Sequence, residues 1–110
     1  MNTQPVPEAL PVLVALPAEI DVTNALDMYD QITAAALKPD ATIIIADMTA
    51  TTFCDGMGLR ILLLAHEFAA RNGTGLRLLK PGRNVRRVME LEGADQVLTI
   101  CESLEKALLP

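Results

Sequence analysis

Residues 42–60 have the sequence TIIIADMTATTFCDGMGLR, which predicts a strand, a loop and the start of a helix in succession. Thr42–Met48 is apolar and β-branched at successive positions, as is typical of a central strand that is covered on both faces. Thr49–Asp55 is a polar loop at the carboxyl end of that strand. The helix then extends from about Met57 to Arg71, with Asp55 as a candidate cap and Asn72-Gly73 as its end.

The sequence before this unit predicts two strands and a helix. Met1–Pro11 contains three prolines and is expected to be a lead-in segment with a short edge strand. Val12–Leu16 suits a buried strand, and Pro17–Asp21 is a turn. Asn24 is then expected to cap a helix, with Asp27 at the third helical position in a box-like arrangement. The helix ends at Lys38-Pro39-Asp40.

The sequence after this unit continues the alternation of strands and helices. We expect a strand at Gly75–Lys80, a helix at Gly82–Glu92, a strand at Val97–Ile100 and a helix at Ser103–Leu109. The whole order is β-β-α-β-α-β-α-β-α. It predicts a single α/β domain over residues 1–110, with a mixed, mainly parallel sheet covered by helices.

The composition restricts the classes of partner. Hydrophobic residues make up 51% of the 110 residues and aromatic residues only 3%, so the core is aliphatic and stacking platforms for single-stranded nucleic acid are missing. The net charge of −5 counts against nucleic acids and anionic membranes. Residues 1–55 carry −7 and residues 56–110 carry +2. This asymmetry indicates either a polarised interaction surface or scattered solvated charges.

The remaining sequence features favour a cytoplasmic protein. The two cysteines, Cys54 and Cys101, form no disulfide framework, and residues 1–16 lack the basic segment of a signal peptide. No apolar run reaches the ~18 residues that span a bilayer. We therefore expect a reduced, cytoplasmic location with no membrane partner.

The loop at residues 49–60 is the strongest candidate for a functional site, because partner and ligand sites collect at the carboxyl ends of parallel strands. Gly56-Met57-Gly58 is not followed by the lysine of a phosphate loop. Cys54 has the chemistry of a nucleophile, but Asp55 and the helical His66 are poorly placed to activate it. The cysteines and His66 match no zinc pattern. We expect no catalytic residue, no metal and no cofactor.

The arginines at 83, 86 and 87 are expected to form a solvated helix face, with contact to a partner as the alternative. His66 is expected to be a half-buried packing residue.

The order of motifs resembles the STAS family, the fold of bacterial anti-sigma factor antagonists. The resemblance runs from about Val12 to the C-terminus. Its parts are Ile20-Asp21 before a helix, residues 46–49 leading into 53–60, Leu76-Arg77-Leu78, residues 85–91, Gly93, and residues 103–108. It implies a domain that binds a protein partner and performs no catalysis.

In such proteins the central motif is Asp-Ser-Ser/Thr/Ala-Gly-Leu, and one of its hydroxyls is phosphorylated by a partner that is both anti-sigma factor and serine kinase. Phosphorylation adds roughly −1.5 to −2 charge and blocks binding. Here Asp55, Gly58 and Leu59 match, but the usual acceptor positions are Gly56 and Met57, which have no hydroxyl. We therefore expect phosphorylation-insensitive binding. Thr51 and Thr52 are the nearest hydroxyls upstream.

Three functions follow from these observations. The first is an antagonist that binds an anti-sigma factor or a related kinase-fold partner. Its expected contact residues are Asp21, Thr23, Asp55, Met57, Gly58, Leu59 and Arg60. The second is a scaffold or assembly subunit that pairs with other STAS proteins. The third is an enzyme or small-ligand binder that uses the Cys54–Gly58 loop.

Overall fold

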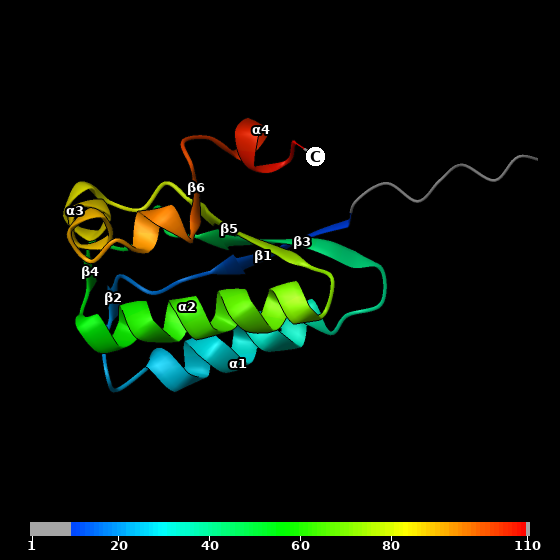
Figure 1. Ribbon diagram of the computed structural model, residues 1–110, viewed down its shortest axis with the longest axis horizontal. Helices are drawn as coiled ribbons and strands as arrows, with labels where there is room; N and C mark the ends of the chain where they lie inside the picture. Colours follow the sequence, from blue (N-terminus) through cyan, green and yellow to red (C-terminus); the bar gives the residue numbers. More distant parts are fainter. Residues whose placement is uncertain (1–9, 110) are drawn as a thin grey trace, which may run out of the picture.

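A four-stranded parallel sheet forms the centre of the computed structural model, which describes residues 10–109 (Figure 1). The strand order is β1 (Leu10–Ala15), β3 (Ala41–Asp47), β5 (Gly75–Leu79) and β6 (Thr99–Cys101). Every pairing within this sheet is parallel. The predicted mainly parallel α/β fold is confirmed.

Strand β3 is buried on both faces, as its sequence predicts. Ile44 and Ala46 point into the larger core, whereas Ile43 and Ile45 belong to a second, smaller cluster on the opposite face. All four side chains are at most 5% exposed. Alternate residues of a strand point to opposite faces, so a run with no polar member needs cover on both sides.

Two helices cover one face of the sheet, and they lie side by side in Figure 1. Helix α1 (Ala25–Ala36) and helix α2 (Gly56–Arg71) bury their apolar faces there. Leu62, Ala65 and Ala69 of α2 are completely buried, which confirms the predicted phase of that helix. The short helix α4 (Leu104–Ala107) covers the smaller cluster on the other face. Helix α3 (Arg83–Leu91) contacts β4 (Phe53–Cys54).

The strand predicted at Val12–Leu16 is present, but the prediction that it is buried is wrong. Strand β1 begins at Leu10 and ends at Ala15, and among the described strands it lies at the sheet edge. Leu13 is 56% exposed, and Val12 and Val14 are only half-buried. A short apolar run does not distinguish an edge strand from a central one. Of the lead-in segment expected at Met1–Pro11, residues 1–9 lie outside the described residues, and Leu10 and Pro11 begin β1.

The predicted turn at Pro17–Asp21 contains a short strand that the sequence did not indicate. Strand β2 (Glu19–Ile20) pairs with β4 in a separate, two-stranded parallel sheet. A two-residue strand has no periodicity, so sequence patterns cannot reveal it. One turn of 3₁₀ helix, η1 (Ala94–Gln96), was missed for the same reason.

Both predicted helix caps lie at the expected positions, but only one uses its side chain as predicted. Asp55 Oδ1 accepts a hydrogen bond from the Gly58 amide at 2.7 Å, which caps α2. Asn24 precedes α1, but its Oδ1 accepts from the Asp21 amide at 3.0 Å and its Nδ2 donates to the Glu19 carbonyl at 2.7 Å. The predicted box with Asp27 is therefore wrong, because the Asn24 side chain holds the preceding turn instead.

Within residues 10–109, no helix is both long enough and apolar enough to cross a membrane.

Candidate functional site

The pairing of β2 with β4 brings together two segments that are 34 residues apart in the sequence. Glu19 lies opposite Phe53 and Ile20 lies opposite Cys54. The Asp55 amide then donates to the Ile20 carbonyl at 3.1 Å. Consequently the turn that begins at Asp21 and the N-terminus of α2 are neighbours at one end of the molecule (Figure 1).

The turn at Asp21 is held in a fixed conformation by its own side chains. The Asp21 carboxylate accepts hydrogen bonds from the Thr23 hydroxyl and from the Thr23 amide, the latter at 2.8 Å. These bonds, above all the one from the hydroxyl, lower the pKa of Asp21 below its ordinary value. Asp21 therefore offers a preorganised negative charge next to α2.

Five of the seven expected contact residues lie at the start of α2, and they fall into two groups by exposure. Met57 is 48% exposed, Arg60 is exposed and Asp55 is half-buried. Gly58 and Leu59 are buried. These two pack inward and support the loop, so they present little side-chain surface to a partner.

Gly58 is needed where α2 crosses β2 and β4. A Cβ atom at this position would lie 2.6 Å from Ile20 Cγ2 and 3.0 Å from Cys54 Sγ. Such contacts are far inside van der Waals distance, so only glycine lets the helix approach the two short strands this closely.

Two exposed apolar side chains at this end were missed by sequence reasoning. Val22 is 70% exposed in the turn after β2, and Phe53 is 49% exposed on β4. They lie in segments that the sequence predicts as turn and polar loop, where a single apolar residue carries no periodic signal. We call the exposed surface formed by these segments the β2–α2 surface; its members are Asp21, Val22, Thr23, Phe53, Asp55, Gly56, Met57 and Arg60.

A shallow groove of about 420 Å³ adjoins the β2–α2 surface. Glu92 lines it just after α3, and the residues that line it on α2 are Gly56, Met57, Leu59, Arg60 and Leu63. The surface is therefore continuous with the C-terminal end of α3.

The hydroxyl groups nearest the α2 cap differ in accessibility. Nothing lies within 4 Å of the position that a Gly56 Cβ would take, so the usual acceptor position is open to solvent. The Thr51 side chain is completely buried and its hydroxyl donates to the Pro17 carbonyl at 2.8 Å. Thr52 is exposed, and its hydroxyl lies 3.4 Å from the Ala18 carbonyl.

Cys54 has the environment of a packing residue. It is 4% exposed, and burial, assisted by the negative charge of Asp55, raises its thiol pKa to about 11. A thiol with such a pKa is almost entirely protonated near neutral pH, and the thiolate is the nucleophile. His66 is half-buried more than two turns further along α2, as expected of a packing residue.

Among residues 10–109, no group of three or more His, Cys, Asp or Glu side chains is arranged to hold a metal ion.

Comparison with known proteins identifies relatives of this fold. The family model described as STAS domain matches residues 2–107. A comparison with curated proteins found no match. The chain is 27% identical to an anti-sigma factor antagonist from Mycobacterium paratuberculosis, with a TM-score of 0.75; the match covers 87% of this chain and 80% of that one.

Two further solved structures show the same fold. The anti-sigma factor antagonist SpoIIAA in its unphosphorylated form is 22% identical, with a TM-score of 0.72 and coverage of 96% of this chain and 90% of that one. The STAS domain of a SulP transporter from Vibrio cholerae is 17% identical, with a TM-score of 0.71 and coverage of 94% and 81%.

Proposed function

Because this chain belongs to the STAS domain family, we propose that it is a regulator of the anti-sigma factor antagonist kind, which binds a protein partner and catalyses no reaction. The partner is an anti-sigma factor with serine-kinase activity or a closely related protein. We place this binding in the cytoplasm.

The observation that carries the proposal is the juxtaposition created by β2 and β4. It places the ordered Asp21–Thr23 turn beside the exposed first turn of α2. Val22, Phe53 and Met57 supply apolar contact area, and Asp21 and Arg60 supply charges of opposite sign. A stable protein interface has this composition, with an apolar centre and a polar rim.

We further propose that binding is not switched off by phosphorylation at the usual position. Gly56 and Met57 have no hydroxyl to accept a phosphoryl group. Thr51 is buried and hydrogen-bonded, and the exposed Thr49 donates its hydroxyl to Asp47 Oδ1 at 2.7 Å. Thr52 is therefore the exposed hydroxyl nearest in sequence upstream of the α2 cap. Thr52 precedes the α2 cap, and kinase positioning is strict enough that a shift of ~1 Å can cost 100-fold in rate.

A scaffold role among STAS proteins is the second candidate. It is favoured by the absence of a phospho-acceptor in the motif, because a structural subunit needs no such switch. Similarity to the STAS domain of a SulP transporter also shows that this fold is not confined to antagonists. Use of Cys54 as a catalytic nucleophile is disfavoured by its raised pKa.

Affinity capture from the source cells tests the proposed function. The native chain, a Met57→Asp variant and a Leu108→Asp control are used as baits, and mass spectrometry identifies the bound proteins. Leu108 is 44% exposed, close to the 48% of Met57, but it follows α4 on the other side of the sheet. Loss of a central apolar contact typically weakens binding by 2 kcal/mol or more, roughly 30-fold.

We expect the native chain and the Leu108→Asp control to retain a kinase-fold protein that Met57→Asp loses. Retention of that protein by Met57→Asp would contradict the proposed surface. Capture of other STAS proteins in its place would favour the scaffold role.

A further inference from the structure

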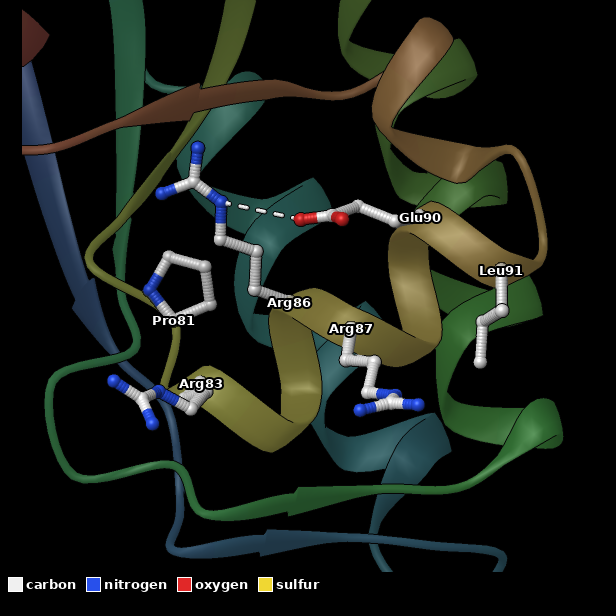
Figure 2. A pocket seen from close by; sticks show the side chains of 6 residues that line it. All are labelled: Pro81, Arg83, Arg86, Arg87, Glu90 and Leu91. Carbon is white, nitrogen blue, oxygen red and sulfur yellow. Dashed lines mark ion pairs between the residues drawn. The ribbon is translucent and has the colours of Figure 1, made fainter.

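The outer face of α3 carries two exposed arginines and an exposed leucine in one row. Arg83, Arg87 and Leu91 are four residues apart, so they lie on one side of the helix, and Leu91 is 75% exposed. We call these three residues the α3 stripe. Together with Pro81, Arg86 and Glu90 they line a shallow depression of about 670 Å³ (Figure 2).

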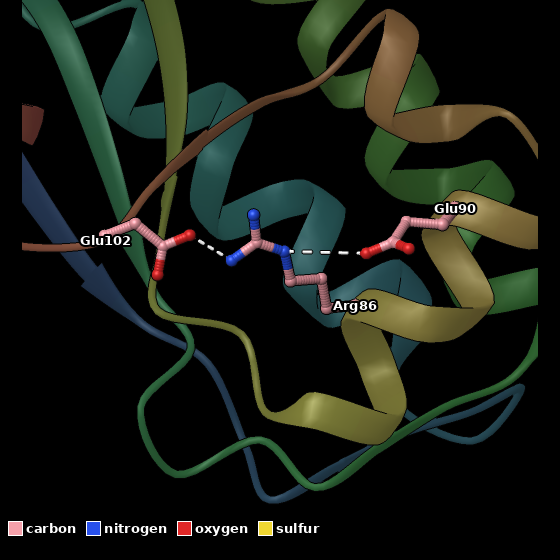
Figure 3. A network of polar contacts seen from close by, with 3 residues as sticks. All are labelled: Arg86, Glu90 and Glu102. Atoms are coloured by element: carbon pink, nitrogen blue, oxygen red, sulfur yellow. Dashed lines mark hydrogen bonds and ion pairs between the residues drawn. The ribbon is translucent and has the colours of Figure 1, made fainter.

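Two acidic side chains close to the α3 stripe, Glu90 and Glu102, are engaged by Arg86. Its Nε lies 3.7 Å from Glu90 Oε1, and its Nη1 donates to Glu102 (Figure 3). Among the ion pairs of residues 10–109, none includes Arg83 or Arg87. The stripe is therefore a local positive surface on a chain whose net charge is −5.

The shape of this surface does not suit a small anion. In Figure 2 the guanidinium groups of Arg83, Arg86 and Arg87 point in different directions, so they do not converge on one point. Guanidinium groups that are spread along a helix are better suited to bind an acidic surface of similar length. A row of this kind fits an acidic helix that also offers an apolar side chain.

The outer face of α1 has the complementary chemistry. Leu26, Asp27 and Asp30 are exposed, and Leu26 is 67% exposed. Neither aspartate takes part in an ion pair within the described part of the chain. We call these three residues the α1 stripe. Helices α1 and α3 lie apart in Figure 1, so the two stripes of one molecule do not meet.

We propose that the α3 stripe binds the α1 stripe of a second copy of this chain. The spacing agrees for one apolar and one charged pair, because Leu26 and Asp30 are four residues apart, as are Leu91 and Arg87. Asp27 and Arg83 add negative and positive charge beside these pairs. When the helices run antiparallel, Leu26 meets Leu91 while Asp30 meets Arg87. Two different surfaces are joined, so the contact is head-to-tail and can add further copies in a row.

The net charge of −5 does not prevent this contact at moderate salt. Near 0.1 M salt the Debye length is about 10 Å, so repulsion between distant charges is screened while charges in contact still interact. Exposed ion pairs are individually weak, so the association is expected only at high protein concentration and is lost at high salt. The contact does not rest on the proposed partner, although it would supply the assembly step of the scaffold role.

Analytical ultracentrifugation of the native chain tests the contact. Between about 20 µM and about 1 mM protein in ~0.1 M salt, we expect the weight-average mass to rise above that of the monomer. At ~0.5 M salt the rise should disappear, because the Debye length falls well below 10 Å. If the native chain stays monomeric at all of these concentrations in ~0.1 M salt, the proposal is overturned.

A charge exchange identifies the surfaces. R83E/R87E reverses the α3 stripe and D27K/D30K reverses the α1 stripe, and circular dichroism confirms that each variant is folded. Each variant alone should remain monomeric, whereas an equimolar mixture should associate at least as strongly as the native chain. The two reversals change the net charge from −5 to −9 and to −1, so non-specific attraction between opposite charges cannot explain association of the mixture.

The control is E67K/R71E, which reverses an exposed ion pair of α2 without changing the net charge. It should associate like the native chain. Association of R83E/R87E alone, or a mixture that stays monomeric, would overturn the proposal. R83E/R87E should still capture the kinase-fold partner, and Met57→Asp should still self-associate. Failure of the self-association proposal can therefore be told apart from failure of the proposed partner binding.

Discussion

Gly56 and Gly58 are two residues apart but have opposite steric surroundings. A Cβ at Gly58 would collide with Ile20 and Cys54, whereas a Cβ at Gly56 would meet nothing within 4 Å. Gly58→Ala is therefore expected to lower the free energy of unfolding by about 1–3 kcal/mol, the usual cost of overpacking. Gly56→Ala is the matched control and should leave it unchanged or slightly higher, since alanine favours helix over glycine.

Urea denaturation of the two variants measures this difference. Equal stabilities of the two variants would mean that α2 does not approach β2 and β4 closely at Gly58.

The Cys54 thiol is a second test at the scale of one residue. Its pKa of about 11 predicts slow alkylation by iodoacetamide at neutral pH, with a rate that rises about tenfold per pH unit until the thiol ionises. Cys54→Ser should leave partner binding nearly unchanged. Peptide mass mapping follows the modification, and rapid, selective labelling of Cys54 at neutral pH would show that the thiol is activated.

The long secondary structure elements could be predicted from sequence because each repeats a pattern over several turns or residues. Helix α2 was predicted within one residue at its start, and the burial of β3 follows from its unbroken apolar run. The two-residue strands β2 and β4 could not be predicted, because their pairing depends on contacts between distant segments. The exposure of β1 was missed because edge position is a property of the assembled sheet.

Leu62 and Leu64 provide a test of the helix phase. Leu62 is completely buried against the sheet and Leu64 is 46% exposed, although both belong to α2. Leu62→Ala is expected to lower the free energy of unfolding by about 2–5 kcal/mol, the range for truncating a buried leucine. Leu64→Ala should cost less than about 1 kcal/mol.

Thermal or urea unfolding of both variants measures these costs. A loss below about 1 kcal/mol for Leu62→Ala would show that this side chain does not face the core.

At the scale of the whole molecule, sequence reasoning found the segments of the candidate site but not the way in which they meet. The motif resemblance selected Asp21, Thr23 and the first turn of α2, and the β2–β4 pairing explains why these residues are neighbours. Val22 and Phe53 join the same surface, while Gly58 is buried beneath it and Leu59 reaches only the adjoining groove. The exposure of a loop side chain depends on how the loop packs against the rest of the fold, so it could not be predicted from the sequence.

The whole chain also combines two surfaces of different character. The β2–α2 surface is partly apolar and is proposed to bind a regulatory partner, whereas the α1 and α3 stripes are charged and are proposed to join copies. The salt dependence of binding distinguishes the two surfaces. Contacts dominated by apolar area are less sensitive to ionic screening than contacts between exposed charges.

The proposed partner surface lacks the usual phosphorylation switch. The most direct measurement is the affinity of the captured kinase-fold partner for the native chain and for Gly56→Ser, before and after incubation with Mg-ATP, with intact mass recorded in parallel. The open space at Gly56 accommodates the serine side chain. We predict that the native chain gains no phosphate and keeps its affinity, whereas Gly56→Ser gains one phosphate and binds at least tenfold more weakly, because phosphorylation adds roughly −1.5 to −2 charge at the interface. Stoichiometric phosphate on Thr51 or Thr52 of the native chain, together with loss of binding, would show that phosphorylation does switch this surface.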